Sequence, residues 1–153
     1  MVMLSKLNSI LILLIILAVS NKVFAQRNDS TLIVQLIKDD YATMGSMDST
    51  AHLRNVTSDY HLIEKGEIWD IQTELDSIYR LNSNRSIVRS DFFTIKTVKI
   101  KGDMAYAFWH LRSEFRENGK LFREVAWIES GVFRKEQERW KIALIHSSYE
   151  RRK

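Results

Sequence analysis

The 153-residue sequence has no cysteine, no proline and only five glycines. Without cysteine the chain cannot form a disulfide, use a thiolate nucleophile or carry a lipid on a cysteine. It also lacks the H-E-x-x-H pattern of zinc hydrolases, the G-x-S-x-G nucleophile elbow and a glycine-rich phosphate loop. Repeats and linker-like segments are absent too, which indicates one continuous domain, and no motif names a reaction.

No apolar run in the sequence is long enough to span a bilayer, but a shorter one stands near the start. Ile10 to Val19 is unbroken and apolar, a lysine precedes it, and the small residues Val23 and Ala25 follow. This pattern predicts a cleaved signal peptide over residues 1–25, because the alternative, an uncleaved membrane anchor, needs roughly 20 apolar residues. We therefore expect an exported protein, periplasmic or extracellular, with one domain over residues 26–153 and no stable membrane insertion after cleavage.

The net charge is small. The 23 basic and 19 acidic residues give +4, and loss of the two leader lysines leaves 21 basic residues and a charge of +2. A nucleic-acid-binding surface needs a stronger positive excess, so we expect no nucleic-acid partner. The four histidines, at positions 52, 61, 110 and 146, lack the regular spacing of metal ligands. Because zinc sites need three or four convergent ligands, we predict no metal site, and we also predict no cofactor.

The first half of the mature chain has helical patterns and the second half has strand patterns. Apolar residues recur at helical spacing over residues 30–47, with Asp39-Asp40 expected on the solvated side. Asp48 and Asp70 can cap two further helices, and Lys65-Gly66 is a turn signal between two β-prone runs. Four strands are predicted over residues 91–100, 104–116, 121–133 and 140–149. This order indicates an α+β fold with helices on one side of an antiparallel sheet.

Two stretches resemble the nuclear transport factor 2-like superfamily, in particular its SnoaL-like bacterial branch: YHLIEKGEIW (residues 60–69) and VFRKEQERWKIALIHSS (residues 132–148). The resemblance spans residues 30–149. It implies a cone-shaped, curved antiparallel sheet wrapped around N-terminal helices, a nuclear transport factor 2-like or cystatin-like roll, with a cavity and frequent dimerisation. Ketosteroid isomerase has this fold and uses two aspartic acids and a tyrosine, but the predicted strands hold no clear second aspartic acid. Its mechanism is therefore not carried over.

The turns set an expected register for the four strands. Two-residue turns at Gly102-Asp103 and Asn118-Gly119 and a four-residue loop over residues 135–138 predict one row across the sheet: Ile95, His110, Trp127 and His146. The face predicted to look inward toward the helices carries Phe93, Ile95, Phe108, His110, Arg112, Trp127, Glu129, Phe133, Trp140, Ile142, Leu144, His146 and Ser148. The opposite face carries Ala105, Ala107, Trp109, Leu111, Ala126, Ile128, Val132, Ala143 and Ile145. Because helices can cover only one apolar face, we expect a homodimer through the small-residue face.

In this register His146 and Glu129 are diagonal neighbours on adjacent strands. One interpretation is catalytic, with His146 as general base, Glu129 as the group that orients it, and Arg112 as the contact for an anionic substrate group. The alternative is that these charges neutralise one another in an ordinary polar pocket. The residues predicted to line the ligand cavity are Tyr41, Trp69, Phe93, His110, Arg112 and Trp127. For Tyr41 and Trp69, core packing is the alternative.

Two classes of function follow. The first is an exported protein that binds a small hydrophobic, partly anionic molecule, with cofactor-free isomerisation, cyclisation or dehydration as its enzymatic form. The second is a non-catalytic dimeric binding or association module of the cell envelope, since one fold serves many functions. An open pocket of roughly 300 Å3 or more favours the first, and an interior filled by aromatic side chains favours the second.

Overall fold

The computed structural model of the chain describes residues 28–81 and 86–151, and the predicted signal peptide lies outside these residues. The elements follow the predicted order of helices, hairpin, helix and meander. Their bounds are: first helix, residues 28–46; α2, Ser49–Asn55; β1, Val56–Glu64; β2, Glu67–Trp69; α3, Ile71–Leu81; β3, Ile87–Lys101; β4, Met104–Glu117; β5, Lys120–Glu136; and β6, Arg139–Tyr149.

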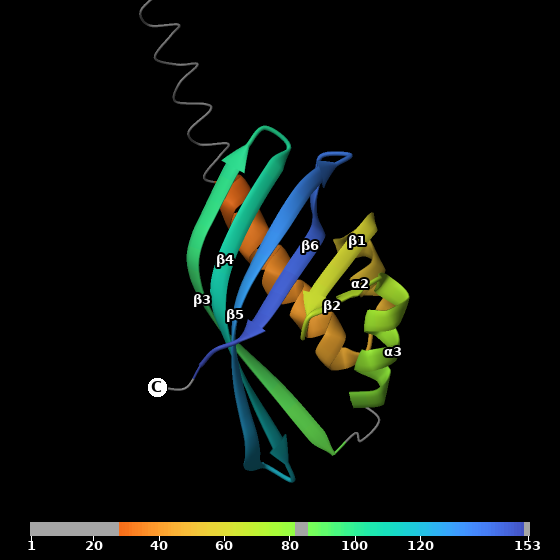
Figure 1. The fold of residues 1–153 in the computed structure, drawn as a ribbon, viewed down its shortest axis with the longest axis vertical. Helices are drawn as coiled ribbons and strands as arrows, with labels where there is room; N and C mark the ends of the chain where they lie inside the picture. Colours follow the sequence, from red (N-terminus) through yellow and green to blue (C-terminus); the bar gives the residue numbers. More distant parts are fainter. Residues whose placement is uncertain (1–27, 82–85, 152–153) are drawn as a thin grey trace, which may run out of the picture.

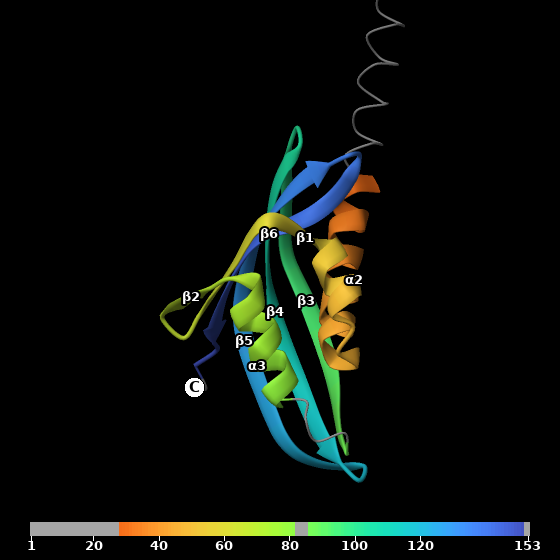
Figure 2. The same cartoon turned by 90° about the vertical axis from the view of Figure 1, so that its right-hand side faces the viewer.

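One six-stranded sheet forms the framework, in the order β2-β1-β6-β5-β4-β3. β3 to β6 form the predicted antiparallel meander. β1 joins this meander by pairing parallel with β6, which the sequence did not indicate, and β2 pairs antiparallel with β1. Figures 1 and 2 show the first helix and α2 on one face of a curved, open sheet. The fold is α+β, as predicted.

The helices use the expected capping residues. The side chain of Asp48 accepts a hydrogen bond from the Ala51 N–H at 2.9 Å, and that of Asp70 accepts one from the Thr73 N–H at 2.8 Å. These bonds satisfy backbone amides that the first turn of a helix leaves without a partner. Among the described residues, no helix is long and apolar enough to cross a membrane.

Three connections are two-residue turns with a left-handed backbone. φ is positive at both residues of Lys65-Gly66, Asn118-Gly119 and Gln137-Glu138. This is the type I′ geometry that matches the twist of a hairpin. The first two turns confirm the sequence prediction. The third shows that the predicted four-residue loop is wrong, because the residues on either side of the turn pair directly.

Each hairpin of the meander contains one β-bulge that the sequence pattern did not reveal. The register shifts at three places: between Ile95 and Thr97, between Phe115 and Arg116, and between Val132 and Phe133. A shift of one residue moves the side chains beyond it to the opposite face of the sheet. The predicted row is therefore wrong. The strands instead bring together Ile95, Trp109, Glu129 and Ser147.

The two faces of the sheet consequently mix the two predicted sets. The buried inner face includes Ala105, Ala107, Trp109, Leu111 and Ile145, all predicted to face outward. The outer face carries Phe108, His110, Arg112, Leu144, His146 and Ser148, all predicted to face inward. Glu129, Phe133, Trp140 and Ile142 are buried on the inner face as predicted. The physical reason is the same throughout, because each bulge inserts one residue into an otherwise regular alternation.

Candidate functional site

Glu129 lies at the centre of the inner face, and only 3% of its surface is exposed. Its carboxyl oxygens accept hydrogen bonds from the Tyr41 Oη at 2.7 Å, the Trp109 Nε1 at 2.7 Å and the Ser147 Oγ at 2.9 Å. β4, β5 and β6 hold Trp109, Glu129 and Ser147 in one row, and the first helix supplies Tyr41. Three neutral donors therefore converge on one buried carboxyl group.

The surroundings of this carboxyl group alter its acidity. Burial raises the pKa of Glu129, because an ionised carboxylate is poorly solvated inside a protein. The three hydrogen bonds oppose that rise, since they stabilise the ionised form. Burial, and then the neighbouring Glu129, raise the pKa of Tyr41 well above its ordinary value. The tyrosine thus keeps its proton and donates it, while Glu129 is the group of the pair that gains or loses a proton.

Arg89 of β3 places a positive charge beside this centre. Its guanidinium carbon lies 5.5 Å from the ring centre of Tyr41, 5.7 Å from that of Phe115 and 5.9 Å from that of Trp127. It also donates a hydrogen bond to Asp91 at 2.8 Å. Its charge favours the ionised form of the central carboxyl group. The aromatic rings hold the guanidinium by cation–π attraction. Its ionic partner is the Asp91 carboxylate.

An open groove of about 800 Å3 runs between the first helix and the edge strand β3. Tyr41, Arg89 and Phe93 line it, and Lys38 adds a second positive charge. A volume of this order is typical of small-molecule sites. Because the Tyr41 hydroxyl group is bonded to Glu129, the groove wall is in direct contact with the buried carboxyl group. The candidate site is this groove together with the acid behind it.

Three predicted site residues lie on the outer face, away from this centre. His146 is exposed, and the His110 Nδ1 lies 3.2 Å from a carboxyl oxygen of Glu150. The Arg112 guanidinium is paired with Glu114 and Glu124. The predicted contact between His146 and Glu129 is wrong, because the bulge in the last hairpin puts the two side chains on opposite faces. The arginine beside this centre is Arg89 of β3, which the sequence did not indicate, and not Arg112.

The structure brings three of the other predicted residues together around Glu129. Tyr41 bonds to it, and the Phe93 ring meets the Tyr41 ring edge-on with centres 5.3 Å apart. Trp127 lies on the same face and stacks on Tyr149, with ring centres 5.9 Å apart. Trp69 does not join them, because it lies on β2 at the opposite edge of the sheet from the groove.

A second buried polar cluster joins the helices. The His52 Nδ1 on α2 lies 2.9 Å from Asp40 of the first helix, and its Nε2 lies 3.4 Å from Glu74 of α3. All three are at most 4% exposed, so Asp40 does not lie on the solvated side as predicted. Burial alone lowers the pKa of His52, but the contacts with Asp40 and Glu74 raise it to about 10. The Tyr60 ring lies edge-on to His52, with centres 6.1 Å apart.

The sequence pattern did not indicate Arg89, Trp109 and Ser147 as neighbours of Glu129. One signal was present, because a glycine inside a strand often marks a close approach by another group. A Cβ at Gly131 would lie 3.2 Å from the indole ring of Trp109. That glycine therefore marks the place where the indole ring crosses β5 to reach Glu129.

Comparisons with known proteins identify the fold. No protein-family model matches the sequence, and no curated protein matches it. The structure is similar to an NTF-2 like protein of unknown function from Shewanella oneidensis MR-1, with a TM-score of 0.61 and 20% identity over 78% of this chain and 98% of that chain. The chain has the nuclear transport factor 2-like fold.

Two further structures share this nuclear transport factor 2-like fold. A conserved protein from Planctomyces limnophilus DSM 3776 has a TM-score of 0.70 and 17% identity over 81% of this chain and 99% of that chain. A ketosteroid isomerase-like protein from Erwinia carotovora atroseptica SCRI1043 has a TM-score of 0.61 and 16% identity over 80% of this chain and 96% of that chain. Identities this low show the fold alone, so the resemblance to the SnoaL-like branch stays a prediction.

Proposed function

We propose that the chain binds a small hydrophobic, partly anionic molecule in the groove between the first helix and β3, and that Tyr41 and Glu129 exchange a proton with it. The observation that carries this proposal is that Tyr41 lines the groove and bonds to a buried carboxyl group. We further propose that the chain is exported, as its first 25 residues predict. A similar structure described as ketosteroid isomerase-like supports cofactor-free proton transfer as the kind of chemistry.

The walls of the groove indicate the chemistry of the ligand. Ile87, Val88 and Phe93 supply apolar surface, and Lys38 and Arg89 supply positive charge. The groove also contains one carboxyl group, which is bonded to the arginine. Two cations against one anion favour a ligand with an acidic group, and an arginine binds a carboxylate through paired N–H donors.

The proton would pass through the tyrosine, because Glu129 is almost fully buried. As a ligand C–H or O–H gives its proton to the Tyr41 oxygen, the tyrosine gives its own proton to the Glu129 carboxylate. The reverse transfer to another ligand atom completes an isomerisation and returns both residues to their starting state. Concerted transfer avoids a free tyrosinate, which the raised pKa of Tyr41 makes costly.

The binding step is tested with 1-anilinonaphthalene-8-sulfonate, a hydrophobic anion whose fluorescence rises on binding. Arg89→Gln removes the charge at the groove and should weaken binding by about tenfold, the size of one charge-assisted hydrogen bond. Lys99→Gln is the matched control, because Lys99 is an exposed cation of β3 outside the groove. Equal affinity in the two variants would place the probe elsewhere. Native mass spectrometry of protein purified from its own host then identifies a retained ligand.

Glu129→Gln separates binding from proton transfer. The amide keeps the shape of the carboxyl group but cannot accept the proton. Probe affinity should therefore change little, while turnover of a substrate found by mass spectrometry is lost. Unchanged turnover in this variant would show that Glu129 is only a structural group.

The outer face favours a second, compatible function, association of two copies. Tyr106, Phe108 and Ile128 are 52%, 41% and 46% exposed and lie on the neighbouring strands β4 and β5. Ile128 belongs to the face predicted for the dimer, but Ala105 and Ala107 of that face are buried, and Phe108 lies outward instead of inward. A second copy would cover this apolar surface.

Light scattering at micromolar concentration tests this association. Phe108→Glu puts a charge in the centre of the surface and should give a monomer. Leu53→Glu, at a comparably exposed leucine of α2, should leave the dimer intact. A wild-type protein that is already monomeric would exclude association through this face.

A further inference from the structure

We propose that His61 and His146 form a binding site for a divalent transition-metal ion on the outer face of the sheet. This face is opposite the one that carries Glu129, so the site is independent of the groove and of the proposed proton transfer.

The parallel pairing of β1 with β6 brings the two histidines together. His61 is opposite Leu144, and Ile63 is opposite His146. The two histidines are therefore diagonal neighbours on adjacent strands, and both are exposed. Neighbouring strands lie about 4.8 Å apart and two residues span about 6.6 Å along a strand, so the two Cα atoms are about 8 Å apart, a separation that two imidazole side chains can bridge through one ion. Two imidazole rings can thus approach one ion from the solvent side.

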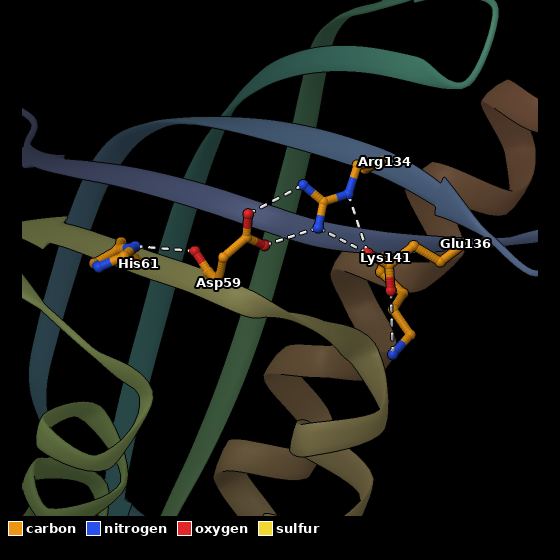
Figure 3. A network of polar contacts seen from close by, with 5 residues as sticks. All are labelled: Asp59, His61, Arg134, Glu136 and Lys141. Atoms are coloured by element: carbon orange, nitrogen blue, oxygen red, sulfur yellow. Dashed lines mark hydrogen bonds and ion pairs between the residues drawn. The ribbon is translucent and has the colours of Figure 1, made fainter.

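The contacts of His61 prepare one of its nitrogens for a metal ion. Its Nδ1 lies 3.0 Å from the backbone oxygen of Asp59, as Figure 3 shows. A carbonyl oxygen can only accept a hydrogen bond, so Nδ1 carries the proton and Nε2 keeps its lone pair. Histidine ligands of metals usually have this arrangement, in which the second nitrogen donates to a carbonyl or carboxylate oxygen.

The surrounding charges do not repel a cation. Arg134 donates to the Asp59 carboxylate at 2.8 and 3.1 Å and also to Glu136, which lies 3.8 Å from Lys141. Each nearby cation in Figure 3 thus has an anionic partner. The two bonds from Arg134 also fix the strand segment to which His61 is bonded.

The composition of the site indicates the class of metal. Imidazole nitrogen is a good ligand for zinc, nickel and copper and a poor one for magnesium or calcium. Within the described ranges, no group of three histidine, aspartate or glutamate side chains is placed to hold an ion together. The protein therefore supplies two ligands and water supplies the rest.

Calorimetric titration of the untagged protein with zinc chloride tests the proposal. We expect one zinc ion per chain. His61→Gln and His146→Gln should each weaken binding by about tenfold or more, since loss of even an outer partner of a metal ligand has an effect of this size. His110→Gln is the matched control, because it removes the third histidine of the outer face and should leave the affinity unchanged.

Three outcomes would overturn the proposal: no saturable zinc binding, unchanged affinity in either of the first two variants, or an equal loss in the control. Nitrogen-15 NMR of the histidine rings provides a readout that does not depend on affinity. Zinc should shift the Nε2 resonance of His61 while Nδ1 keeps its proton, and circular dichroism should show that each variant remains folded.

Discussion

Glu129 and His52 are at the centres of two buried polar clusters that hold charge in opposite ways. Glu129 accepts hydrogen bonds from neutral donors, whereas His52 lies between two carboxyl groups. A buried carboxyl group with neutral donors can change its protonation state as its surroundings change. A buried ion pair cannot lose one partner without leaving an uncompensated charge. The first arrangement is suited to proton exchange and the second to holding helices together.

The two clusters also differ in how many of their polar atoms have hydrogen-bond partners. Both oxygens of Glu129 have partners, and the adjoining groove gives a ligand access to its hydrogen-bonded tyrosine. In the cluster around His52, one oxygen of Asp40 and the hydroxyl group of Tyr60 have no hydrogen-bond partner within the described residues, and the His52 Nε2 and Glu74 meet only as an ion pair at 3.4 Å. Low exposure alone therefore does not show which buried charge is functional. The type of partner and the nearest open space decide it.

The largest effect should come from His52→Gln. This change keeps a side chain of similar size but leaves two buried carboxyl groups without a cation. We expect the free energy of unfolding to fall by about 3–5 kcal/mol, the range for breaking a buried pair. Urea unfolding measures the loss. His110→Gln, at a partly exposed histidine, should cost less than about 1 kcal/mol.

A triple variant in which all three charged groups around His52 are neutral completes the unfolding test. Adding Asp40→Asn and Glu74→Gln to His52→Gln removes the uncompensated charges as well. Part of the lost stability should return. If the single variant is as stable as the wild type, the cluster does not hold the helices together.

The next effect concerns the glycine beneath the Glu129 cluster. A Cβ at Gly131 would lie 3.1 Å from the Phe133 ring and 3.2 Å from the Trp109 ring, so Gly131→Ala should cost about 1–3 kcal/mol. It should also move the indole N–H away from Glu129, which indole NMR can follow. Gly45→Ala is the control, because nothing lies within 4 Å of its new Cβ. A helical glycine replaced in open space should instead give a gain of up to about 1 kcal/mol.

The smallest effect, taken per pH unit, is the slope of stability against pH, which separates the two clusters. Both groups bind a proton more tightly in the folded state, so both contribute stability that is lost as the pH rises. For Glu129 the loss begins above its ordinary pKa of 4.5, and for His52 it extends from 6.5 to about 10. Within its window His52 should contribute a slope of about 1.4 kcal/mol per pH unit, and Glu129 should contribute a slope of the same sign.

Two variants show which residue causes the loss of stability in each pH range. Glu129→Gln should abolish the lower slope and leave the upper one, and His52→Gln should do the reverse. The measurement is urea unfolding at a series of pH values. A lower slope that persists in Glu129→Gln would show that another group titrates there.

Much of the fold could be predicted from the sequence because its signals are local. Asp48 and Asp70 cap helices, and Lys65-Gly66 and Asn118-Gly119 form turns, as their residue types indicate. The bulges could not be predicted, because an inserted residue leaves apolar side chains on both faces of an already apolar sheet. The parallel pairing of β1 with β6 also has no local signal, since it joins distant parts of the chain.

The candidate site was predicted only in part for the same reason. Glu129, Phe93 and Trp127 were identified by their types and lie on the predicted face, and Tyr41 of the first helix contacts two of them. One bulge puts their expected partner His146 on the opposite face of the sheet. The arginine that lies beside them is Arg89 and not the predicted Arg112. The residue types of a site can thus be read from a sequence when the register cannot.

The pairing of β1 with β6 constrains how the chain folds. β1 comes early in the sequence, and the strand beside it is the last one of the sheet. β1 and β2 can pair with each other locally, but the second edge of β1 stays unpaired until the last strand of the chain is available. Such long-range pairing slows folding and exposes strand edges to aggregation. The β1 edge that faces β6 is therefore the segment most open to intermolecular strand pairing before folding is complete, whereas the finished sheet leaves β1 paired on both sides.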